Sequence, residues 1–359
     1  MTKESSSSHE TPVILQPEFE RITGLVLAEF QVDEALLDHG VPTYYLKQPQ
    51  ETKQAFLRLL KNLESTNLIA LLKRAEGKIV LRVVPRPPAK PSNILINWIL
   101  LLATVATTFI TGYMLSPDAI SPFAGGAAFA AAMLAILGTH EMGHKIAANK
   151  KGIAATSPYF VPGPPPFGTF GAVIMQKSLP PNKDALFDVG ATGPIAGFMI
   201  ATAVSIIGLT LSVPSPKVEG TEIGVPILWF LIAMFLGNLN MLPQAPPDEI
   251  LLLHPVAFAG WVGLLVTMLN LLPAAMLDGG HVARSIFGEK LRFVLTALSI
   301  LYLVVEGFYP MAFLVLFISM YRHPGPLDDV SGLSTSRKLL AIAMIAIFVL
   351  CTIPFLPIL

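Results

Sequence analysis

The sequence predicts a polytopic α-helical membrane protein with about six transmembrane helices and a small α+β soluble N-terminal domain. The first observation is composition: 53% of the 359 residues are apolar, 13% are charged, and the mean hydropathy is +0.63. Average soluble domains carry about 25% charged residues. The second observation is distribution, because much of the charge lies in residues 1–92 and long apolar runs fill residues 93–359.

The predicted soluble domain, residues 1–92, contains both strand and helix patterns. The segment 41–47, VPTYYLK, favours a strand, and 68–84 predicts two strands around a Glu-Gly turn. Within 51–66, apolar residues recur at helical spacing, at Phe56, Leu59, Leu60 and Leu63. The proline-rich stretch 85–91, PRPPAKP, indicates a stiff linker that ends the domain.

The rest of the chain contains apolar runs of membrane-spanning length. A helix needs about 20 residues to cross the hydrocarbon layer. Runs near this length occupy 94–115, 123–144, 189–212, 254–277 and 338–357, and a shorter pair occupies 292–305 and 308–321. The uncharged stretch 225–237 is shorter than a span, which is typical of re-entrant or interfacial segments.

The positions of basic residues predict the topology, because cytoplasmic loops carry the excess of Lys and Arg. If 225–237 does not cross the membrane, the loops rich in Lys and Arg all fall on one side. If it crosses, they divide between the two sides. The first arrangement is therefore predicted, with the N-terminal domain in the cytosol and the runs at 123–144 and 254–277 crossing in the same direction.

The motif that carries chemistry lies in ILGTHEMGHKIAANKK, residues 136–151, at the end of the second run. His140, Glu141 and His144 form an H-E-x-x-H pattern. Two histidines four residues apart share one face of a helix, so both imidazoles can bind one ion, and the glutamate can reach a water on that ion. Charged and metal-binding groups are costly in lipid, which argues for a function.

A catalytic zinc site usually has three protein ligands. The single cysteine, Cys351, makes a cysteine-based site very poorly supported, so a third ligand is expected from a carboxylate or histidine. The candidate is Asp278 in NLLPAAMLDGGHVARSIFG, residues 270–288. Because the second and fourth runs cross in the same direction, Asp278 reaches the same depth as the two histidines.

These motifs resemble those of the site-2 proteases, which are intramembrane zinc metalloproteases. The resemblance rests on His140, Glu141 and His144, on Asn270, Pro273, Asp278 and Gly279 in NLLPAAMLDGGH, and on FDVGATGPIAGF at 187–198. The segment 167–178, FGTFGAVIMQKS, and the soluble domain are most similar to the branch found in plastids, cyanobacteria and archaea. The similarity covers residues 120–290, the expected core of a transmembrane protease domain spanning 93–359.

The resemblance implies one Zn²⁺ per chain, with His140, His144 and Asp278 as ligands, Glu141 as catalytic acid/base, and Asn270 as a polar group supporting the site or the substrate. The implied activity is cleavage of transmembrane protein substrates within or near the bilayer. A prokaryotic cell membrane is the expected location, with a thylakoid or plastid-type membrane as the alternative. Equal numbers of acidic and basic residues, 24 each, argue against a nucleic-acid partner. The oligomeric state stays open.

Substrate form follows from backbone chemistry, because the carbonyl groups of a transmembrane helix are hydrogen-bonded internally. A substrate therefore has to unwind locally, and an unwound strand can add to an exposed edge. The β-prone segment 169–175, TFGAVIM, is the candidate edge, preceded by the proline-rich 158–168. The alternative is an ordinary connecting loop.

Two rival functions fit parts of the sequence. A metal transporter would also place polar groups in spans, but an ion path has no need of Glu141 between two helical histidines. A helix-binding protein without protease activity is the second rival. Among other residues, Gly193, Pro194 and Gly197 are interpreted as a helix-packing face. His281 is interpreted as a cap or loop contact, with a fourth polar neighbour of the site as the alternative, and His323, outside any apolar run, receives no role.

Overall fold

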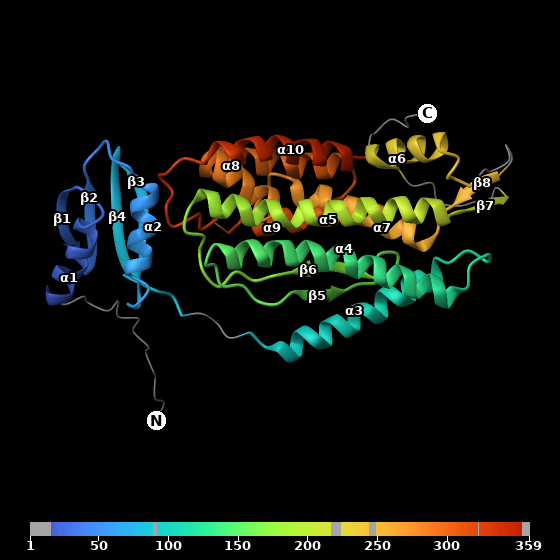
Figure 1. The fold of residues 1–359 in the computed structure, drawn as a ribbon, viewed down its shortest axis with the longest axis horizontal. Coiled ribbons are helices and arrows are strands. Elements are labelled where there is room, and N and C mark those ends of the chain that lie inside the picture. The colour runs from blue at the N-terminus through green and yellow to red at the C-terminus, as the bar shows by residue number, and fades with distance from the viewer. Residues whose placement is uncertain (1–15, 89–91, 217–223, 244–248, 322, 354–359) are drawn as a thin grey trace, which may run out of the picture. The chain divides into compact units, whose positions relative to one another are not determined.

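The computed structural model describes residues 16–88, 92–216, 224–243, 249–321 and 323–353 (Figure 1). The chain forms two compact units. The first, called the sheet unit, consists of Met1–Ala89 together with the short segments Leu179–Lys183 and Gly325–Gly332. The second, called the helical unit, comprises the remaining residues.

The sheet unit contains one four-stranded antiparallel sheet in the order β1-β2-β4-β3. Its elements are α1 Gln16–Leu27, β1 Val32–Asp38, β2 Val41–Leu46, α2 Lys53–Asn62, β3 Leu68–Ala75 and β4 Lys78–Pro85. The predicted helix and three strands are present. Both helices pack on one sheet face, where Val26, Phe56 and Leu72 are fully buried. The helix α1 and the strand β1 were absent from the sequence prediction.

Two segments that are distant in sequence complete the sheet unit. The amide of Leu72 on β3 donates to the carbonyl of Leu327 at 2.8 Å, and the amide of Leu327 donates to Pro180 at 2.9 Å. The Leu327 side chain is 3% exposed and lies in the same core as Leu72. The sheet unit is therefore assembled from three separate stretches of chain.

The helical unit holds the apolar helices. They are α3 Ile94–Met114, α4 Pro122–Lys150, α5 Lys183–Leu211, α6 Ile227–Asn238, α7 Pro255–Leu271, α8 Asp278–Val305, α9 Tyr309–Ser319 and α10 Thr335–Cys351. Two small hairpins accompany them, formed by β5 Tyr159–Pro162 with β6 Thr169–Val173 and by β7 Val213–Pro216 with β8 Glu249–Leu252. The mostly helical architecture with a small sheet region agrees with the predicted class.

Three of the described helices, α3, α4 and α5, are long and apolar enough to cross a membrane. The helices α6, α7 and α9 are also apolar but shorter. The twelve residues of α6 extend over about 18 Å, less than the roughly 30 Å of a hydrocarbon core.

Packing of α4 against α7 forms the centre of the helical unit. Buried residues of α4, including Met133 and Ile136, join Leu264 and Met268 of α7 in one apolar cluster. A Cβ added to Gly263 of α7 would lie 2.9 Å from the Ile136 side chain, so glycine permits the close approach. This contact brings the end of α7, and the loop that follows it, to the second half of α4.

Candidate metal centre

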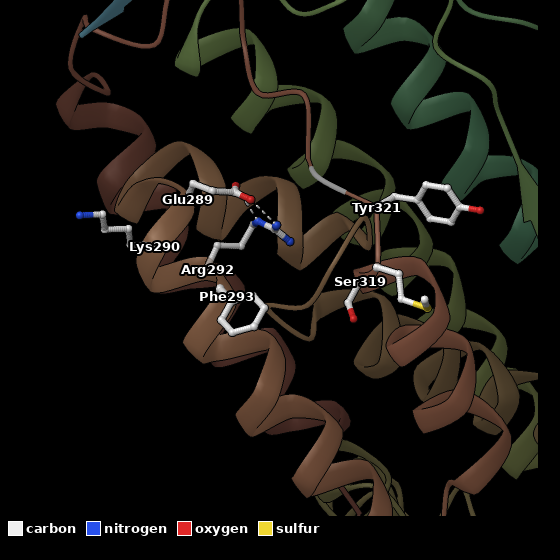
Figure 2. A pocket seen from close by; sticks show the side chains of 7 residues that line it. Glu289, Lys290, Arg292, Phe293, Ser319 and Tyr321 are labelled. Carbon is white, nitrogen blue, oxygen red and sulfur yellow. Dashed lines mark hydrogen bonds and ion pairs between the residues drawn. The ribbon is translucent and has the colours of Figure 1, made fainter. Parts of the chain in front are cut away.

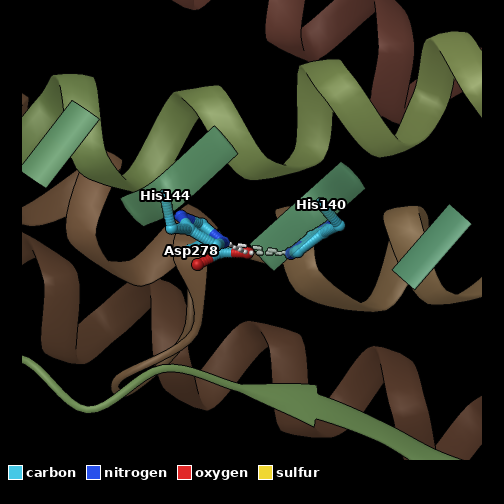
Figure 3. Close-up of side chains that lie close together, drawn as sticks. All are labelled: His140, His144 and Asp278. Carbon is cyan, nitrogen blue, oxygen red and sulfur yellow. Dashed lines mark hydrogen bonds and ion pairs between the residues drawn. The ribbon is translucent and has the colours of Figure 1, made fainter. Parts of the chain in front are cut away.

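Three of the predicted site residues meet in one cluster (Figure 3). The Nε2 atoms of His140 and His144 are 3.0 Å apart, and Asp278 Oδ2 lies 3.2 Å from the first and 3.3 Å from the second. All three side chains can offer a ligand atom to one metal ion. The structure thus brings together residues that are 138 positions apart in sequence.

The spacing of these atoms fits a zinc ion. Bonds of about 2.0–2.2 Å in a tetrahedron separate the ligand atoms by about 3.3–3.6 Å. The three observed separations of 3.0, 3.2 and 3.3 Å are close to those edges. Two neutral imidazoles and one carboxylate are also a donor set that zinc prefers. Three ligands leave a fourth tetrahedral position for water or substrate.

Local helix geometry positions the two histidines. They lie four residues apart on the uninterrupted helix α4, and both are buried, with 4% and 5% of their surface exposed. The Nδ1–H of His144 donates to the carbonyl of Val189 on α5 at 2.6 Å. This bond selects the tautomer with a lone pair on Nε2, the form that binds a metal.

Glycines of α5 leave room for the imidazole rings. A Cβ added to Gly193 would overlap the His144 ring, and one added to Gly197 would lie 3.0 Å from His140 Nδ1. The sequence interpretation of these glycines as a packing face missed this specific partner. The sequence contained a signal for this pairing, because Gly193 and Gly197 on α5 have the same four-residue spacing as His140 and His144 on α4. The two helices run in opposite directions, so Gly193 meets His144 and Gly197 meets His140.

Asp278 is presented by a tight turn between α7 and α8. It is the first residue of α8, and Gly279 and Gly280 follow it. Added Cβ atoms on these glycines would collide with the carbonyl oxygens of the preceding loop, at Leu271, Leu272, Ala274 and Ala275. The Gly-Gly pair therefore lets the loop fold onto the first turn of α8.

The two other predicted site residues, Glu141 and Asn270, lie on α4 and α7. Glu141 is 5% exposed, and its carboxylate lies close to the backbone of Ile174, the residue after β6. Asn270 is half-buried near the end of α7, and no hydrogen bond of its side chain is found within the described ranges. The structure thus gives Glu141, but not Asn270, a contact that indicates its orientation.

A histidine pair near the cluster, with His323 buried and His281 partly buried, was missed by the sequence analysis. His281 Nδ1 and His323 Nε2 form a 2.7 Å hydrogen bond. Burial lowers the pKa of His281 to about 4, so its ring is neutral at pH 7. No local pattern links His281 to His323, because His281 lies in the first turn of α8 and His323 follows α9. Only the tertiary fold pairs them.

Fold and site together define a class of protein: an apolar helical chain in which an H-E-x-x-H helix and a distant aspartate form a buried cluster that could hold a metal ion. Comparison with known proteins gives the same answer. The sequence model of peptidase family M50 matches residues 128–306, which include all three candidate ligands. The chain belongs to peptidase family M50, and the resemblance to site-2 proteases is confirmed.

Plant proteins are among the relatives. The probable zinc metalloprotease EGY1, chloroplastic, of Oryza sativa subsp. japonica is 34% identical over 230 residues, 62% of this chain and 39% of the relative. The probable zinc metalloprotease EGY2, chloroplastic, of Arabidopsis thaliana is 30% identical over 280 residues, 74% of this chain and 50% of the relative. The probable zinc metallopeptidase EGY3, chloroplastic, of Arabidopsis thaliana is 29% identical over 230 residues, 57% of this chain and 39% of the relative.

The chain spans about half or less of the length of these three relatives. No solved structure matches the chain significantly.

Proposed function

We propose that this protein is an intramembrane zinc metalloendopeptidase that cleaves transmembrane protein substrates within or near the bilayer. The observation that carries the proposal is the triangle of His140 Nε2, His144 Nε2 and Asp278 Oδ2, with edges of 3.0–3.3 Å. Membership of peptidase family M50 and the names of the plant relatives support zinc as the metal. One ion per chain is expected.

Each site residue has a distinct proposed role. His140, His144 and Asp278 hold the zinc ion, which when bound polarises a scissile carbonyl and makes water a stronger nucleophile. Glu141, next to His140 on α4, accepts the proton of the attacking water and returns it to the departing amine nitrogen. Asn270, on α7, is proposed as a polar support for the substrate backbone.

The hairpin of β5 and β6 supports a binding mode for the substrate. Within the described chain, β6 pairs with β5 alone, which leaves its second edge without a strand partner. An unwound substrate segment can add along that edge by main-chain hydrogen bonds. Because Ile174 follows β6 and its backbone lies close to Glu141, a strand on this edge would pass beside the catalytic carboxylate.

The membrane arrangement is part of the proposal. About six crossings are proposed, with residues 1–92 as a cytosolic soluble domain and linker and 93–359 as the protease domain around the core 120–290. The length of α6, twelve residues, supports a segment that enters without crossing. A prokaryotic cell membrane or a plastid-type membrane is the proposed location, and the lipid bilayer and its transmembrane proteins are the partners.

The test compares the wild-type protein with Glu141→Gln in defined detergent and in proteoliposomes. Zinc content is measured by elemental analysis, and cleavage is followed on a substrate with one transmembrane helix. We expect about one zinc ion in both proteins, and a loss of cleavage of at least about 100-fold in the variant, since general acid–base groups contribute roughly 10²–10⁴-fold.

The outcomes separate the functions that the sequence left open. Cleavage that persists in Glu141→Gln would remove the proposed mechanism. Zinc flux into proteoliposomes without cleavage would favour transport instead. Zinc bound by both proteins, with neither cleavage nor flux, would favour a helix-binding role.

A further inference from the structure

The loop that presents Asp278 is bound by side chains that follow it in the sequence, on α8. It runs from Leu272 to Leu277, between α7 and α8, and Ala275 at its centre is 1% exposed. Ala275 has φ of +45°, a left-handed conformation that residues other than glycine rarely adopt. Such a conformation persists only where the surroundings impose it.

Two side chains of α8 bind both polar groups of Ala275. The amide of Ala275 donates to the Thr296 hydroxyl at 3.0 Å, and an Arg292 Nη1 group donates to the Ala275 carbonyl at 3.1 Å. Thr296 and Arg292 are 3% and 4% exposed and lie one helical turn apart. The buried loop therefore obtains its hydrogen bonds from side chains that follow it by 17 and 21 residues.

A break in α8 makes these contacts possible. Gly288 has φ of +77° and ψ of −172°, which separates the first turns of α8 from the segment that carries Arg292 and Thr296. A residue with a side chain is strained in that conformation. The redirected segment brings the two side chains back to the loop.

The arginine is itself held in place. Figure 2 shows its guanidinium joined to the Glu289 carboxylate, with Nε to Oε2 at 3.1 Å and Nη2 to Oε1 at 2.7 Å. Arg284 reaches the same carboxylate at 3.1 Å. A two-point contact of this kind fixes the plane of a guanidinium, so the remaining Nη1 group points at Ala275.

From these contacts we infer that Thr296 and Arg292 are positioning residues for Asp278, acting through the Ala275 peptide three residues before it. The inference rests on the proposed zinc function. Thr296 and Arg292 do not touch the metal cluster. They hold the loop in the conformation that aims the Asp278 carboxylate at His140 and His144. Outer groups that orient metal ligands typically change metal affinity by about 10–100-fold.

The experiment measures Zn²⁺ affinity by competition with a chelator in full-length Thr296→Val, Thr296→Ser and Ser299→Ala. Valine keeps the shape of threonine and removes the hydroxyl, whereas serine keeps the hydroxyl. Ser299 is the matched control, because it is buried on the same helix and its hydroxyl donates only to Leu295 of that helix at 2.8 Å. The Co²⁺-loaded proteins report ligand geometry through their visible absorption.

We expect Thr296→Val to weaken Zn²⁺ binding by about ten-fold or more and to alter the Co²⁺ spectrum, while Thr296→Ser and Ser299→Ala remain like the wild type. Arg292→Lys, which loses the two-point contact with Glu289, should weaken binding in the same direction. If Thr296 had a purely structural role, Thr296→Val would have a lower melting temperature. Its Zn²⁺ affinity and Co²⁺ spectrum, measured well below that temperature, would be unchanged.

Wild-type Zn²⁺ affinity and Co²⁺ spectrum in Thr296→Val would overturn this inference and leave the proposed protease function intact. A wild-type protein that binds neither metal would overturn both, because there would be no ligand geometry to position. Equal weakening in Thr296→Val and Ser299→Ala would also overturn it, since any lost hydroxyl on α8 would then act alike.

Discussion

Replacing Gly193 with alanine is the sharpest test of how α5 shapes the metal centre. The added Cβ would overlap the His144 ring, including its Nε2 atom. Carbon atoms pack at about 3.5–4.0 Å, so either the ring or α5 has to move by more than about 1 Å. Metal–ligand distances tolerate only about 0.2 Å. Movement of α5 would also stretch the 2.6 Å bond from His144 Nδ1 to Val189.

We expect Gly193→Ala to lower zinc affinity by roughly 10–100-fold, the range found when a metal ligand loses its orientation. Zinc retained after dialysis against graded chelator gives the affinity, and helical circular dichroism verifies the fold. Gly138→Ala on α4 is the matched control, because its added Cβ meets only Phe160, at 3.9 Å. Wild-type zinc affinity in Gly193→Ala would refute the steric argument.

Two further predictions concern other parts of the chain. Leu327→Ala truncates a side chain that is 3% exposed in the sheet-unit core and should lower the free energy of unfolding by about 2–5 kcal/mol. Hydrogen exchange at the Leu72 amide, which donates to the Leu327 carbonyl, should accelerate. Unchanged protection of that amide would contradict the assembly of the sheet unit from three stretches of chain. His281 has its pKa lowered by burial to about 4, so its stabilising neutral form is complete above the unfolded pKa of about 6.5 and is lost as pH falls toward 4. The melting temperature of His281→Phe should therefore fall less steeply from pH 6.5 to 4.5 than that of the wild type, since the titration of His281 is removed while Asp278, His144, Arg292 and its hydrogen-bond partner His323 remain. Equal slopes in His281→Phe and the wild type would reject the assignment.

Much of the fold could be predicted from local patterns. Helical spacing identified the helix of 51–66, seen as Lys53–Asn62, and alternation around the Glu-Gly turn identified β3 and β4. The turn has φ of +51° at Glu76 and +80° at Gly77, as such a hairpin requires. The helix α1 was missed because it is not strongly apolar and belongs to the core only through Ile22, Val26 and their neighbours.

The sequence by itself determined the two histidines and the glutamate of the candidate site, because four-residue spacing on one helix places both imidazoles on one face regardless of the surroundings. It also identified Asp278 as a candidate, since two apolar runs predicted to cross in the same direction would bring their polar ends to equal depth. These inferences needed only helix geometry and the cost of polar groups in lipid.

The tertiary structure decided everything that depends on neighbours distant in sequence. The place of Gly193 against His144, the pairing of His281 with His323 and the hold of Thr296 on Ala275 all join separate elements. No spacing rule encodes such contacts, because they arise when several elements pack at once and each buried polar group has to find a partner. For this protein, the two candidate histidine ligands follow from helix periodicity, and the orientation of all three candidate ligands follows from packing.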